Sequence, residues 1–118
     1  MKKNSVKNIR INSEVQREMS QILREEIKDP RVHPMTSVMA VEVTPDLKFA
    51  KIYVSVLGSE EEKEKTMEGL NKSASFARGQ LARRMNLRNT PELTFILDHS
   101  IEYGVAMSKR IDEVNHRE

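Results

Sequence analysis

The 118-residue sequence has no cysteine, few aromatic residues and no long apolar run. The lack of cysteine excludes disulfide bonds and thiolate metal sites. An aromatic content of 4% argues against a large aromatic-lined ligand pocket. No segment reaches the roughly 20 apolar residues that cross a bilayer, and the basic start lacks the apolar core of a secretory signal. We therefore expect one cytoplasmic domain over residues 1–118, without a membrane partner.

The charges nearly balance, with 20 basic and 18 acidic residues, but they are unevenly distributed. The acids gather in residues 59–68, whereas residues 72–88 carry no acid. The basic residues before the first acid, Glu14, are Lys2, Lys3, Lys7 and Arg10. We expect residues 1–10 to form a flexible basic arm, and the polarisation points to an anionic partner.

Catalytic and metal-binding motifs are missing. The three histidines, His33, His99 and His116, lack the paired spacing of metal ligands. Asp98 beside His99 stands where a helix cap belongs, which favours capping over acid–base chemistry. There is no phosphate-binding loop, dinucleotide fingerprint or nucleophile elbow. We expect no cofactor, no metal, no small-molecule substrate and no enzymatic activity.

A first helix is predicted over residues 12–28. Ser13 and Gln16 fit a capping box, and apolar residues then recur at helical spacing. Pro30 cannot continue a helix and restricts the residue before it, so the helix should end there.

Two strands, residues 36–43 and 48–57, are rich in β-branched residues and flank the turn sequence TPDL. Such a pattern is typical of a hairpin. A third, short apolar strand is predicted over residues 93–97.

A second helical region starts at Ser59, where Glu62 completes a capping box. Its apolar stripe continues to Met85, and a last helix is predicted from Asp98 or Ser100 to about Val114. The order α-β-β-α-(interrupted)-α-β-α indicates an α+β domain, with helices on one face of a three-stranded sheet.

The segment SFARGQLARRMNL, residues 75–87, places a glycine among arginines. Glycine inside a helix costs roughly 1 kcal/mol relative to alanine. In an unbroken helix one exposed arc would hold Lys72, Phe76, Gly79 and Arg83. Bases could stack on the aromatic ring and phosphates could approach the glycine. If the helix breaks near Ala77–Gly79, the new helix start offers an anion site instead. Both alternatives favour nucleic-acid binding over a merely solvated face.

The whole chain resembles the ribosome-binding factor A family. The matching stretches are REMSQILREEIKDPRV, VEVTPDLKFAKIYVSVLG and ARGQLARRMNLRNTPELTFILDHSIEYG, in that order. The resemblance implies a type II KH-like fold in which an Ala-x-Gly kink replaces the GXXG loop. The residues that match this kink are Ala77, Arg78 and Gly79.

The resemblance also implies a function. Members are non-enzymatic assembly factors that bind the small ribosomal subunit and its rRNA, support 5′-end processing of the rRNA precursor and are associated with growth in the cold. We expect the same of this chain, acting as a monomer. The predicted RNA-binding residues are Lys72, Arg78, Gly79, Arg83, Arg84, Arg88, Lys3, Lys7, Arg10 and Arg31.

Two alternatives stay open. One is a generic RNA-binding KH-like module without a ribosomal target. The other is a protein-interaction domain that uses an exposed sheet edge, in which the charges serve solubility.

Overall fold

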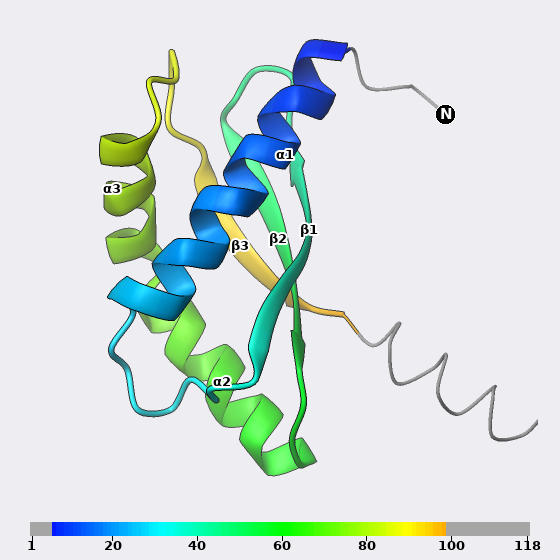
Figure 1. The fold of residues 1–118 in the computed structure, drawn as a ribbon, viewed down its shortest axis with the longest axis vertical. Coiled ribbons are helices and arrows are strands. Elements are labelled where there is room, and N and C mark those ends of the chain that lie inside the picture. Colours follow the sequence, from blue (N-terminus) through cyan, green and yellow to red (C-terminus); the bar gives the residue numbers. More distant parts are fainter. Residues whose placement is uncertain (1–5, 99–118) are drawn as a thin grey trace, which may run out of the picture.

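The computed structural model describes residues 6–98 of the chain, with side chains from residue 9 onward (Figure 1). The elements in chain order are α1 (Val6–Gln21), the π-helical turn η1 (Ile22–Glu26), β1 (Thr36–Val43), β2 (Phe49–Val56), α2 (Glu60–Lys72), α3 (Ala74–Arg84) and β3 (Glu92–Leu97). The helix predicted from Asp98 or Ser100 lies outside the described residues.

The three strands form a mixed sheet in the order β1-β2-β3. β1 and β2 are antiparallel, with Val41 opposite Ile52, and β2 and β3 are parallel. The register of the antiparallel pair shifts between Val38 and Ala40. The predicted hairpin and third strand are therefore confirmed, to within one residue at each end.

One face of this sheet carries the core. Ala50, Ile52 and Val54 alternate along β2 and are almost fully buried, as the two-residue period of a strand requires. The helices lie on this side of the sheet (Figure 1), and Leu70 and Leu81 reach the same cluster from α2 and α3. The expected α+β architecture with helices on one face is confirmed. Within residues 6–98, no helix is long and apolar enough to cross a membrane.

The first helix begins earlier than the sequence indicated. Val6–Arg10 already belong to α1, so the expected flexible arm is wrong for these residues, and residues 1–5 lie outside the description. Ser13 therefore lies inside the helix rather than at its start. The reason is tertiary packing: Ile11 extends the apolar stripe by one turn into the core, and this burial outweighs the local capping signal.

Helix α1 also covers the edge strand of the sheet. Asn12 Oδ1 accepts a hydrogen bond from the Val43 N–H at 2.9 Å, and Gln16 Nε2 donates to the Met39 carbonyl at 3.3 Å. Two main-chain groups of β1 are thus bonded to α1 rather than open to a further strand.

The second helical region starts as predicted. Ser59 Oγ accepts from the Glu62 N–H, and Glu62 Oε1 accepts from the Ser59 N–H at 2.8 Å. These bonds form the capping box. The backbone bond from Ser59 lowers the pKa of Glu62, because it favours the ionised carboxylate.

The break in this region lies at Ser73 and not at Ala77–Gly79, so the predicted position of the kink is wrong. Ser73 has φ −92° and ψ 1°, and its N–H points to the carbonyls of Gly69 and Leu70. Ala77 is fully buried and donates its N–H to the Ser73 carbonyl at 2.8 Å, which continues α3. Gly79 has no positive φ that would require a turn. The axes of α2 and α3 diverge at Ser73 (Figure 1), and α3 packs against α1.

Candidate nucleic-acid interface

Helix α3 has a bare stretch of backbone at Gly79. A Cβ atom added there would meet nothing within 4 Å. At Gly69, in contrast, the added Cβ would lie 3.0 Å from Val32 Cγ2 and 3.2 Å from Arg31 Cβ. Gly69 is therefore explained by close packing of the loop before β1, whereas Gly79 costs helix stability without a packing reason. Gly79 marks a place where another molecule can approach the backbone.

A shallow hollow opens beside this glycine, between α3 and the loop that follows it. It is lined by Ser75, Arg78, Gly79, Ala82, Asn89 and Thr90. The loop is held by two contacts: Asn89 Nδ2 donates to the Leu47 carbonyl at 2.9 Å, and Arg78 donates to the Thr90 carbonyl. The bare backbone thus faces a hollow whose second wall is fixed in place.

Arg78 is one of these tethers. Its Nε and Nη2 groups donate to the Thr90 carbonyl at 3.2 and 2.9 Å, while the side chain stays exposed. In the structure Arg78 positions the loop that carries Arg88. A phosphate contact by Arg78 would be a second role beside this one.

Arg84 is engaged in a clamp between α3 and the end of the first helix. Its guanidinium donates to Glu18 at 3.3 Å, to Gln21 at 2.9 Å and, through a short bond, to Glu26. The hydrogen bond to Glu26 raises the pKa of Arg84 above its usual value, because it favours the charged form. Arg84 was predicted as a phosphate contact, but its hydrogen-bonding groups are directed into this clamp.

Loss of the clamp is expected to lower stability. In Arg84→Met the carboxylates of Glu18 and Glu26 lose the cation between them, and their repulsion is no longer offset. The urea midpoint of unfolding should fall clearly below that of wild type, without a change in the slope.

Arg83→Met is the matched control, because Arg83 is exposed and forms no hydrogen bond or ion pair with the described residues. Its midpoint should stay near that of wild type. Equal midpoints for the two variants would contradict the clamp.

Arg31 is also held in place. Its guanidinium bonds Asp29 at 2.6 and 3.0 Å and Glu68 at 3.3 Å, which fixes the loop after η1 on α2. The bonds from Arg31 lower the pKa of Asp29 from its usual 3.8 to about 2. Like Arg84, Arg31 has a structural task that its sequence context did not reveal.

This depressed pKa makes a definite contribution to acid stability. A carboxyl whose folded-state pKa lies below its unfolded value stabilises the fold above the unfolded value. For Asp29 this contribution is lost as the pH falls from about 4 to about 2. Asp29→Asn should therefore lower the urea midpoint at pH 7 and flatten its pH dependence between about pH 4 and 2. Asp46→Asn serves as a comparison for this pH dependence, because the pKa of Asp46 is also lowered, in its case by the hydrogen bond from Thr44 in the hairpin turn. If Asp29→Asn leaves the fall of the urea midpoint between about pH 4 and 2 unchanged, Asp29 is not the group responsible for it.

The remaining predicted cations are open to a ligand. Four of the predicted cations whose side chains are described are exposed and form no hydrogen bond or ion pair within residues 9–98, and we call them the open cations: Arg10, Lys72, Arg83 and Arg88. Arg10 and Arg88, far apart in the sequence, line one hollow together with Ile11, Pro45, Leu47, Asn86 and Leu87. Lys72 ends α2, next to the break, and Arg83 lies one turn after Gly79 on α3. The side chains of Lys3 and Lys7 lie outside the description.

An exposed aromatic completes the surface. Phe76 is 47% exposed and lies one turn before Gly79 on α3. We call Phe76, Gly79 and Arg83 on α3, together with Arg88 in the loop that follows the helix, the α3 surface. An unpaired nucleic-acid strand could stack a base on the Phe76 ring, approach the bare backbone at Gly79 and place its phosphates against the two cations. The part of the chain that the structure describes contains no cluster of three His, Asp or Glu side chains that could hold a metal ion.

The fold and this surface define the chain as a KH-like α+β domain whose third helix, α3, carries arginines and no acid. The chain belongs to the ribosome-binding factor A family, whose sequence profile matches residues 7–111. Ribosome-binding factor A of Lachnoclostridium phytofermentans is 64% identical over 115 residues, which are 98% of this chain and 85% of that protein.

Solved structures agree on the fold. The crystal structure of ribosome-binding factor A from Thermus thermophilus has a TM-score of 0.67 at 23% identity, over 76% of this chain and 94% of that one. A homology model of the Thermus thermophilus protein, fitted into a cryo-EM map of a 30S–RbfA complex, has a TM-score of 0.62 at 24% identity. It covers 75% of this chain and 91% of its own.

Proposed function

We propose that this protein is an assembly factor of the small ribosomal subunit that binds free subunits through their rRNA. The α3 surface docks on an unpaired or distorted rRNA strand, and Arg10 and Lys72 contact flanking phosphates. The protein acts as a cytoplasmic monomer, without catalysis or a small-molecule substrate. Its binding supports 5′-end processing of the small-subunit rRNA precursor and growth in the cold.

The observation that carries this proposal is the bare backbone at Gly79 one turn from the open cation Arg83, in a chain of this family. A guanidinium that is hydrogen-bonded to protein carboxylates, as in Arg84, has few N–H groups left to donate to a phosphate. Arg83 and Arg88 have no such partner among the described residues. A Cβ-free helix surface lets a ribose-phosphate backbone come closer to α3 than any side chain would allow. The 30S complex described for the Thermus thermophilus protein, a member of the same family, supports the small subunit as the target.

Binding of this kind acts by holding one local arrangement of rRNA. The protein can shift the equilibrium between competing rRNA arrangements only by the difference between its binding free energies for them. Free subunits in which the strand is accessible should therefore bind, and joined ribosomes should not.

The test is sedimentation of purified protein with free small subunits, large subunits and joined ribosomes at two salt concentrations. We expect selective co-sedimentation with free small subunits that weakens steeply with salt, because phosphate contacts release counterions. A strain that lacks the protein should accumulate 5′-extended small-subunit rRNA, most clearly in the cold. Equal binding to unrelated RNA would leave only a generic RNA-binding module, and binding insensitive to salt would point to a protein partner.

A further inference from the structure

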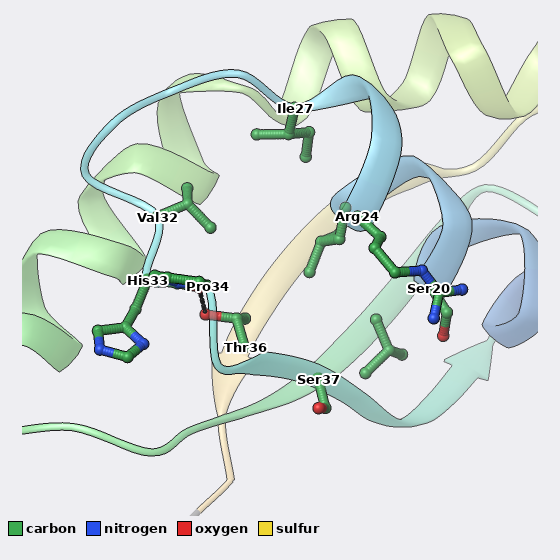
Figure 2. Close-up of a pocket in the computed structure, with 10 residues that line it drawn as sticks. Ser20, Arg24, Ile27, Val32, His33, Pro34, Thr36 and Ser37 are labelled. Carbon is green, nitrogen blue, oxygen red and sulfur yellow. Dashed lines mark hydrogen bonds between the residues drawn. The ribbon is translucent and has the colours of Figure 1, made fainter.

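A third hollow lies apart from the α3 surface and shares no residue with it. It has a volume of about 540 Å³ and opens between η1, the loop that follows and the start of β1 (Figure 2). Leu23, Ile27, Val32 and Val38 supply its apolar part. Around them stand the polar side chains of Ser20, Arg24, His33, Thr36 and Ser37. The volume lies within the roughly 300–1,000 Å³ typical of small-ligand sites.

The walls of this hollow are fixed by hydrogen bonds. The His33 N–H donates to Thr66 Oγ1 on α2 at 3.0 Å, and Thr36 Oγ1 donates to the His33 carbonyl at 2.6 Å. The Arg31–Asp29 pair holds the same loop from its other end. The hollow is thus largely preformed, so a ligand would not have to order the loop first.

The lining has cationic character without a compensating acid. Arg24 is exposed, and within residues 9–98 it forms no hydrogen bond or ion pair. No Asp or Glu lines the hollow. His33 is already engaged, because its Nδ1 accepts from the Met35 N–H and its Nε2 lies 3.3 Å from Glu62 Oε2. Arg24 is therefore the group available to an anion.

The hydroxyl groups offer hydrogen bonds at the rim. Ser20 Oγ donates its proton to the Gln16 carbonyl, so its oxygen remains able to accept. Ser37 is exposed and has no hydrogen-bond partner for its hydroxyl among the described residues. In Figure 2, Ser20 and Arg24 stand on the helical side, with Ser37 on the strand.

We propose that this hollow binds a single nucleotide. The base lies on the apolar side chains, the hydroxyls of Ser20 and Ser37 contact its polar edge, and Arg24 binds the phosphate. A planar heteroaromatic group with one attached anion matches a lining that combines apolar side chains, two available hydroxyl groups and one cation. The source is either a free nucleotide or a nucleotide extruded from RNA. The site goes beyond the proposed function, because it would exist even if the α3 surface bound no rRNA.

The test is a titration of the full chain followed by amide NMR. Nucleoside monophosphates at millimolar concentration should shift the amides of Ser37 and Val38, and Arg24→Gln should weaken binding about tenfold, as expected for a charge-assisted contact. Arg17→Gln is the matched control: Arg17 lies on α1, is 71% exposed and does not line the hollow. Ribose 5-phosphate and an uncharged nucleoside should each bind more weakly than the complete nucleotide.

Two outcomes would overturn the site. One is the absence of shifts at the lining amides for every monophosphate. The other is equal binding of ribose 5-phosphate and the complete nucleotide, which would show that no base is held. Subunit binding then separates the sources. If Arg24→Gln weakens both nucleotide and subunit binding, the nucleotide belongs to rRNA. If only nucleotide binding falls, the ligand is free, and the proposed function stands or falls with the α3 surface alone.

Discussion

Replacing Arg83 and Arg88 together by glutamate is expected to weaken binding to free small subunits by roughly a hundredfold at physiological salt. Two favourable phosphate contacts become two repulsive ones, and the loss of two contacts should also reduce the slope of log K against log salt by about 2. The measurement is a set of sedimentation or fluorescence titrations at several salt concentrations.

Folding should be spared in this variant, because both side chains are exposed and contact no partner among the described residues. Reversal of Lys28 and Lys51 to glutamate is the charge-matched control, since it changes the net charge equally at exposed positions that form no hydrogen bond or ion pair among the described residues. If both double variants lose affinity equally, net charge and not the α3 surface governs binding. If the Arg83, Arg88 variant binds like wild type, the proposed interface is wrong. Arg84 is left out of this test, because its loss would disturb the clamp to α1 and η1.

Substitutions at Gly79 should separate stability from binding. Gly79→Ala is expected to raise the free energy of unfolding by about 1 kcal/mol, because alanine is the better helix former and its Cβ meets open space. Binding to the subunit should nevertheless weaken, and Gly79→Leu should weaken it further, since each added side chain keeps rRNA away from the backbone. Urea unfolding and subunit titration of the same samples measure the two effects.

Two controls make this result specific. Gly69→Ala should lack the gain in stability, because its Cβ would press on Val32 and Arg31. Asn71→Leu places an equally large side chain at an exposed position of α2 and should leave subunit binding unchanged. Improved stability together with unchanged binding for both Gly79 variants would refute close approach at this glycine.

The parts of the fold that the sequence predicted correctly depend on neighbours along the chain. The hairpin follows from alternation and from a turn that contains Pro45 and Asp46, and Asp46 indeed accepts from the Thr44 hydroxyl and the Lys48 N–H. The capping box joins Ser59 to a residue three positions on. Such signals involve a few adjacent residues, so a single sequence contains them completely.

The parts that were predicted wrongly depend on contacts across the fold. The start of α1 follows from the burial of Ile11, and the continuation of α3 through Ala77 follows from packing in the core. Local preference pointed to Ser13 for the start of α1. For the region of Gly79 the sequence left an unbroken helix and a break at Ala77–Gly79 as alternatives, and the resemblance favoured the break.

The candidate site shows the same division. A run of arginines indicated an anionic partner, but it could not tell which of them the protein itself uses. Arg84 meets Glu26 58 positions away in the chain, and Arg31 meets Glu68. Arg83 and Arg84 are therefore the same residue type with different roles: Arg84 joins α3 to the first helix, whereas Arg83 has no partner among the described residues. Only the direction in which each side chain leaves α3 distinguishes them.

The covering of β1 by α1 has a consequence for self-association. β1 is a terminal strand of the sheet, and an uncovered terminal strand is a template on which a second copy can add its own strand. Asn12 and Gln16 occupy two of its main-chain groups, at Val43 and Met39, so α1 shields this edge as well as packing on the core. Partial fraying of the first helix, rather than global unfolding, is therefore the step that would open this edge of the sheet to a strand from a second copy.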